Sequence, residues 1–166
     1  MALQSTVRFK QAFGVPGSFF NSSPRRVAPY NVYTASTEAV NAVGSVAFGS
    51  TNASANDTVS IGGQTYTFKA ELTAATTANE VLIGTDAAAS VANLAAAVNK
   101  GTGAGTKYGS NTVKNAWAVA SIGTTNTTLT LTAITAGAQG NSIALSASVA
   151  TATAFANGSD GVNAPA

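Results

Sequence analysis

The stretch "DTVSIGGQTYTFKA", residues 57–70, holds the clearest β-hairpin signal in the chain and decides the fold class. Apolar and small polar residues alternate on both sides of a Gly-Gly pair, as they do in strands with one buried face. Gly62 and Gly63 suit a two-residue hairpin turn because both tolerate positive φ. The predicted inner face of this hairpin consists of Val59, Ile61, Tyr66 and Phe68.

The period changes in "TDAAASVANLAAAVNKG", residues 85–101. Apolar residues recur there at the spacing of one helix face, at Ala87, Val91, Leu94 and Val98. Thr85 or Asp86 can cap the start, and Lys100-Gly101 suits the end. This pattern predicts one α-helix over about residues 86–99.

Five further segments have the composition of strands: "VGSVAFGS" (43–50), "EVLIG" (80–84), "AWAVASIG" (116–123), "TTLTLTAIT" (127–135) and "IALSASVAT" (143–151). We expect the last two to form a second hairpin, and we expect Trp117 to lie in the core. The sequence predicts six to eight strands and one helix, a mainly β fold with a β-sandwich or barrel-like body. The body would cover residues 41–166 and end in a short polar tail from Phe155 onward.

Charge is scarce and unevenly distributed. Charged residues make up 8% of the chain, against about 25% in ordinary domains. Residues 1–37 carry a charge of +4, whereas residues 38–166, with four basic and six acidic side chains, carry −2. A basic segment on a mildly acidic body favours an acidic partner. Four basic residues are few for nucleic acid, so we expect no direct nucleic-acid binding.

The chain contains no Cys and no His. This excludes disulfides, thiol nucleophiles, imidazole bases and the usual zinc sites. No spacing selects a catalytic pair among the six acids, so we expect no enzyme, no catalytic or metal-binding residues and no cofactor. The first residues lack a continuous apolar stretch, and no run suffices for a membrane span. We therefore expect a soluble protein, made in the cytoplasm, with no membrane partner.

Two motifs invite a ligand-binding interpretation. "GTGAGTKY", residues 101–108, contains glycines and a lysine, but it follows the predicted helix, whereas phosphate-binding loops precede one. Helix exit and loop explain it better. "NGSDG", residues 157–161, could offer oxygen ligands to a cation, but Asn, Asp and Gly favour a plain turn. We expect Asp86 to act as a helix cap.

Residues 1–40 are predicted to form an extended N-terminal arm. Three prolines interrupt it, at Pro16, Pro24 and Pro29, and more than half of the eleven Phe and Tyr residues lie in it. Arginine and aromatic side chains are enriched at protein interfaces, which favours a docking role over solvated charge. The candidate partner-binding residues are Arg8, Lys10, Phe13, Phe19, Phe20, Pro24, Arg25, Arg26 and Tyr30.

The segment "QAFGVPGSFFNSSPRRVAPYN" resembles the N-terminal signature of tailed-phage capsid cement (decoration) proteins. The resemblance covers about residues 7–32 and rests on Gln11, Ala12, Gly14, Val15, Gly17, Phe19 or Phe20, Asn21, Pro24 and Arg25. Residues 56–149 are similar to a β-rich module that recurs in phage capsid, tail and fibre proteins. The family's usual body after the arm differs from this one.

The resemblance implies a virion structural protein on the outer surface of the capsid. Its main partner would be the major capsid protein, whose subunits it would bridge against internal DNA pressure, and it would self-associate as a dimer or trimer. Two alternatives stay open. One is a tail, collar or fibre-attachment protein. The other is a host-glycan-binding β-domain, which would need exposed aromatic side chains on the body.

Overall fold

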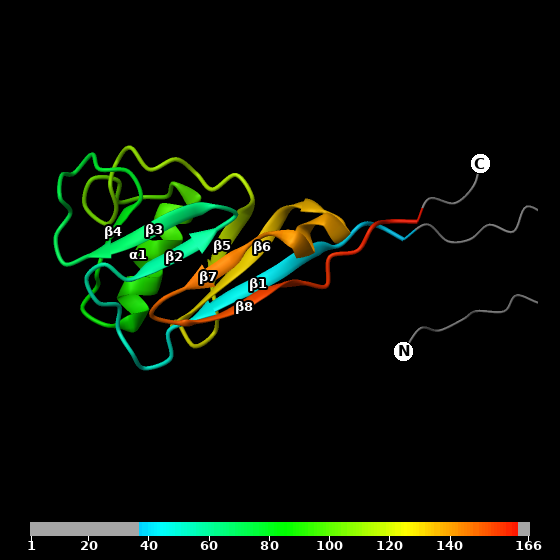
Figure 1. Ribbon diagram of the computed structural model, residues 1–166, viewed down its shortest axis with the longest axis horizontal. Coiled ribbons are helices and arrows are strands. Elements are labelled where there is room, and N and C mark those ends of the chain that lie inside the picture. The colour runs from blue at the N-terminus through cyan, green and yellow to red at the C-terminus, as the bar shows by residue number, and fades with distance from the viewer. Residues whose placement is uncertain (1–36, 163–166) are drawn as a thin grey trace, which may run out of the picture. The chain divides into compact units, whose positions relative to one another are not determined.

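The computed structural model describes residues 37–162 of the chain (Figure 1). All described residues belong to one compact unit. The described elements are β1 (Asn41–Ala47), β2 (Thr58–Ile61), β3 (Gln64–Lys69), β4 (Glu80–Leu82), α1 (Ala87–Asn99), β5 (Ala118–Ile122), β6 (Thr128–Ala136), the 3₁₀-helix η1 (Ala138–Ser142), β7 (Leu145–Ala147) and β8 (Thr151–Ala156).

The strands form two four-stranded sheets, which confirms the mainly β prediction. The first sheet has the order β5-β6-β1-β8 and the second the order β4-β3-β2-β7. All pairs are antiparallel except β3 and β4, which run parallel. The two sheets remain separate within residues 37–162, so the arrangement is sandwich-like and not a closed barrel.

The hairpin of β2 and β3 forms as predicted. Ile61 pairs with Gln64 across the turn, and Gly62 and Gly63 have φ values of 58° and 87°. Positive φ at both central residues matches the twist of the two strands, which is why two glycines occur together here. The predicted inner face is fully buried, at Val59, Ile61, Tyr66 and Phe68.

Helix α1 also agrees with the sequence pattern. Asp86 is the N-cap, and its carboxylate accepts a hydrogen bond from the Ala89 N–H at 2.7 Å. Lys100 adopts the left-handed conformation that ends the helix, with its N–H directed at the carbonyls of Ala96 and Ala97. The predicted stripe is buried throughout, at Ala87, Val91, Leu94 and Val98.

The helix packs against β4 and β5, each an edge strand of a different sheet (Figure 1). The Asn93 side chain donates to the carbonyl of Leu82, the last residue of β4, at 2.9 Å. The Asn99 side chain both donates to Ala120 O and accepts from Ala120 N in β5, at 2.8 and 2.9 Å. Helix α1 therefore joins the two sheets along one side, and the consecutive strands β7 and β8 contact each other across the other side.

The predicted second hairpin is wrong. Strand β6 pairs with β1 and β5, whereas β7 pairs with β2 in the other sheet. Because β6 has a partner on both edges, it has no free edge for β7. The chain leaves it through η1 and crosses to the second sheet, and Ile143 is only half-buried.

The predicted polar tail also begins too early. Phe155 belongs to β8 and is buried, with its ring against Gly44 of β1. A Cβ on Gly44 would lie 3.2 Å from that ring, so glycine makes room for it. Beyond β8, isolated antiparallel β-bridges pair Ser159 with Val40 and Val162 with Thr37.

Candidate functional site

Trp117 is the single tryptophan of the chain, and 55% of its surface is exposed. The prediction that it lies in the core is wrong. It immediately precedes β5, and the inward position is taken by the next residue, the fully buried Ala118. Its backbone is nevertheless fixed, since its N–H donates to Asn115 Oδ1 and its carbonyl accepts from the Ile134 N–H, both at 2.9 Å.

The Trp117 side chain covers the turn between β2 and β3. A Cβ on Gly62 would lie 2.2 Å from Cδ1 of the indole, which no side chain could tolerate. Gly62 is itself held in place, because its N–H donates to the Ala144 carbonyl at 2.8 Å. The indole therefore packs directly on backbone and has a defined position.

Asn115 anchors the segment from inside and is 1% exposed. Its amide donates to the Ile61 carbonyl at 3.1 Å and to Gln64 Oε1 at 3.4 Å. Its oxygen accepts from the N–H groups of Trp117 and Ala118 at 2.9 and 3.0 Å. One buried side chain thus connects β2 to the start of β5 and satisfies its full hydrogen-bonding capacity.

Tyr66 lies in the same buried region. Burial raises the pKa of Tyr66 to about 12, and the neighbouring Asn115 side chain has a smaller, lowering effect on that pKa. The Tyr66 hydroxyl makes no hydrogen bond of normal geometry with the described residues. Because Asn115 already uses both N–H groups and both acceptor positions elsewhere, we regard its interaction with Tyr66 as weak.

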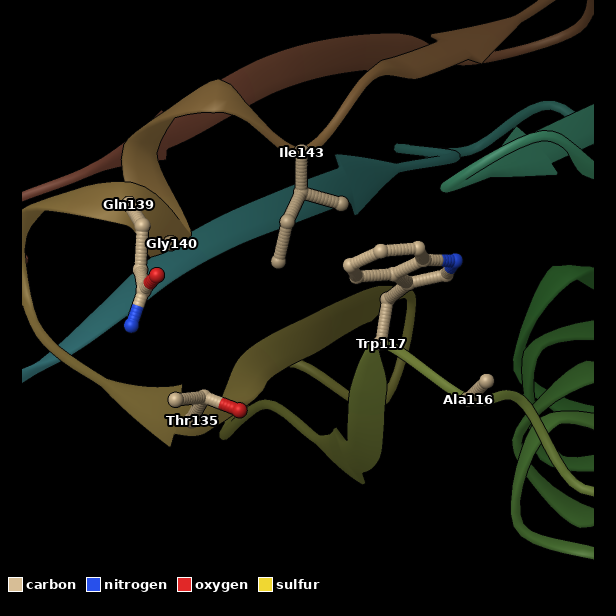
Figure 2. A pocket seen from close by; sticks show the side chains of 6 residues that line it. All are labelled: Ala116, Trp117, Thr135, Gln139, Gly140 and Ile143. Atoms are coloured by element: carbon tan, nitrogen blue, oxygen red, sulfur yellow. The ribbon is translucent and has the colours of Figure 1, made fainter.

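Two adjoining hollows, with volumes of about 170 and 340 Å³, lie beside Trp117. We call them together the Trp117 groove. Their lining residues are Gly62, Ala116, Trp117, Thr135, Gln139, Gly140, Ser142, Ile143 and Ala144. Figure 2 shows Trp117 and Ile143 facing each other, with Gln139 and Thr135 around the same space. None of the described lining residues is charged.

Three polar side chains of this groove, Thr135, Gln139 and Ser142, are exposed. Within residues 37–162, none of these three side chains makes a hydrogen bond. The groove therefore combines a fixed aromatic surface with amide and hydroxyl groups that make no side-chain hydrogen bond to the described part of the chain and can bind a ligand.

Four carboxylates of the body stabilise local structure. Asp86 caps α1, Glu80 accepts from the Thr73 N–H and hydroxyl at 2.8 and 2.7 Å, and Asp57 accepts from the Ser54 N–H at 2.7 Å. Asp160 of the "NGSDG" motif accepts from the Ala138 N–H at 2.9 Å, which favours the turn interpretation. Within the described ranges, no three side chains gather that could hold a metal ion.

The "GTGAGTKY" loop follows α1, as predicted. Tyr108, at the end of the loop, contacts the residues before it. Its hydroxyl donates to the carbonyl of Gly101, the first residue of the loop, and its own carbonyl accepts from the Gly105 N–H. The Lys100 ammonium group donates to the carbonyls of Ser110 and Thr112. These contacts fasten the loop to the helix end, so Lys100 and the backbone of the loop have structural roles.

All candidate partner-binding residues named from the sequence precede residue 37 and lie outside the described residues. They are Arg8, Lys10, Phe13, Phe19, Phe20, Pro24, Arg25, Arg26 and Tyr30. The sequence pattern did not predict the Trp117 groove. The lone tryptophan was its only visible signal, since the approach of η1 and the β2–β3 turn depends on long-range packing.

Comparison of the sequence with protein-family models and with curated proteins gives no match. Among the described helices, none combines the length and the apolar character required to cross a bilayer.

Proposed function

We propose that this chain is a virion structural protein that binds the outer surface of a phage capsid and stabilises the shell by bridging major capsid protein subunits. The proposal rests on the resemblance of residues 7–32 to capsid cement proteins and on the contrast between a basic segment and a mildly acidic body. The arm would dock on the capsid, the body would lie outside, and copies of the body would associate as dimers or trimers.

One structural observation carries the proposal furthest: the first described residues of the body are hydrogen-bonded through their backbone to its last described residues. Thr37 and Val162 exchange backbone hydrogen bonds of 3.1 and 3.0 Å, and Val40 and Ser159 exchange bonds of 2.8 and 3.2 Å. A pull on the segment before Thr37 would therefore be transmitted to two paired backbone segments. This arrangement suits a protein that resists force.

The composition of the body supports the same role. The described buried core runs from Ala42 to Phe155 and includes residues of both sheets and of α1. The chain carries a net charge of only +2, although net charge normally keeps a free protein dispersed. A polar, nearly uncharged surface suits a protein that is permanently packed against other subunits in an assembly.

The test is retention of the full-length protein on purified, undecorated capsids at moderate salt. R25A/R26A should bind much more weakly, and R25K/R26K should recover only part of the binding, because lysine cannot form the bidentate and stacked contacts of a guanidinium. K107A/K114A removes the same charge from exposed positions of the body and serves as the matched control.

Each variant's melting temperature is measured alongside. If R25A/R26A stays folded and binds like the parent, the arginines are solvated charges and the docking role fails. Copy number in purified virions separates the head from the tail: hundreds of copies indicate a cement protein, and a dozen or fewer indicate a tail, collar or fibre-attachment protein.

A further inference from the structure

We propose that the Trp117 groove binds a neutral pyranose sugar, with the apolar face of the sugar ring lying on the indole. The proposal is independent of capsid binding, since it concerns only described residues of the body. It is carried by three features of the groove: an exposed aromatic surface in a fixed position, an uncharged lining, and free amide and hydroxyl groups beside the ring.

The first feature is the indole itself. More than half of the Trp117 surface is exposed, although tryptophan contributes a large apolar area when it is buried. Its backbone is held on both sides, by Asn115 and Ile134, and the ring lies on Gly62. A ligand that stacks on this ring would therefore cost little ordering of the protein, which favours binding.

The second feature is the absence of charge among the residues that line the groove. An ionic ligand that lost its hydration here would find no opposite charge among the described lining residues, which is costly. The lining therefore favours a neutral ligand. The combined space reaches the lower end of the range of small-molecule sites, roughly 300–1,000 Å³, so one or two sugar rings would fit better than a long apolar segment.

The third feature distinguishes a sugar from an apolar peptide. Gln139 offers two donors and an acceptor, and Thr135 and Ser142 each offer a hydroxyl. A pyranose has an apolar C–H face for the indole and a rim of hydroxyl groups for these side chains. An aliphatic side chain would match the indole alone and would displace water from the polar groups without replacing its hydrogen bonds.

The chain has a single tryptophan, so its tryptophan emission reports on this groove alone. The full-length protein is titrated with glucose, galactose, mannose, N-acetylglucosamine and short oligomers of each, to concentrations well above the millimolar range. We expect a saturable change in tryptophan emission with at least one of these series. Saturation-transfer NMR with the same sugar then compares the variants.

W117A should weaken binding about tenfold or more, as truncation of a central aromatic contact does. W117F should retain part of the affinity, and Q139A should lose several-fold. V113A removes an exposed apolar side chain outside the groove and should bind like the parent. Melting temperatures show whether each variant is folded.

The proposal is overturned if none of the sugars gives a saturable change, or if a folded W117A binds the active sugar as tightly as the parent. A third outcome also overturns the proposal. In it, tryptophan emission changes with protein concentration, sedimentation shows that the protein associates, and no sugar reverses that association. That outcome would assign the groove to an interface between copies of this chain.

Discussion

The rings of Phe48 and Phe68 meet edge to face, with centroids 5.7 Å apart and planes at 76°. Phe48 follows β1 in the first sheet, and Phe68 lies in β3 of the second, so this contact joins the two sheets. Both side chains are buried. Contact between the two sheets thus depends on a specific aromatic pair as well as on aliphatic packing.

The aromatic pair predicts a measurable coupling. F68A should lower the free energy of unfolding by about 3–5 kcal/mol, as loss of a buried phenylalanine does. In a double-mutant cycle of F48L and F68L, the edge-to-face contact should give a coupling of about 0.5–1.5 kcal/mol. Denaturant unfolding gives the free energy of unfolding of the parent, of the two single leucine variants and of the double variant. Additive effects within about 0.3 kcal/mol would show that the ring geometry contributes nothing beyond burial.

Helix α1 predicts a second large effect. Leu94 is fully buried in the middle of the helix stripe, so L94A should cost about 2–5 kcal/mol of unfolding free energy. L72A makes the same chemical change at a half-buried loop position and should cost clearly less. Denaturant unfolding compares the two variants. A cost below about 1 kcal/mol for L94A would contradict its assignment to the core.

Tyr66 predicts a specific dependence on pH. Its pKa is raised to about 12 in the folded protein, whereas the unfolded chain has the ordinary value of about 10. As pH rises, the unfolded state loses the proton first, so stability is retained below about pH 10. It then falls by about 2–3 kcal/mol as pH approaches the raised value.

Y66F should abolish this part of the alkaline loss and leave stability at pH 7 unchanged or higher, since the buried hydroxyl lacks a full hydrogen bond. Y108F is the contrasting variant. Burial also raises the pKa of Tyr108, but its hydroxyl donates to the Gly101 carbonyl, so Y108F should lose stability already at pH 7. Urea unfolding at several pH values measures both. A Y66F profile parallel to that of the parent above pH 10 would contradict the prediction.

The parts of the fold that were predicted correctly depend on local patterns. The hairpin around Gly62-Gly63 and helix α1 each place their alternation, turn or cap within a few consecutive residues, so the sequence alone suffices. Strand partners are different. The period of two in residues 127–135 shows which side chains face inward, but β-pairing between segments distant in sequence leaves no such mark. The same alternation suits β7 or β1 as the neighbour of β6.

The candidate site was missed for a related reason. The expected burial of Trp117 rests on its position in a strand pattern beside small residues, and tryptophan is highly buried on average. Its exposure depends on Asn115, which holds the backbone, and on the β2–β3 turn, which fills the space beneath the ring. Both contacts connect segments about fifty residues apart and therefore appear only in the folded structure.

The adjacent glycines of the β2–β3 turn allow the position of the indole to be tested directly. Gly62 and Gly63 both have positive φ, so alanine is strained at either position and should cost about 1 kcal/mol or more in each. Only at Gly62 would the new Cβ meet the Trp117 ring, at 2.2 Å, whereas nothing lies within 4 Å of a Cβ at Gly63. G62A should therefore destabilise the protein more than G63A and displace the indole. Tryptophan emission and acrylamide quenching should change in G62A and stay like the parent in G63A. Equal emission and quenching in two folded variants would show that the indole does not rest on Gly62, and the fixed aromatic surface inferred for the Trp117 groove would lose its support.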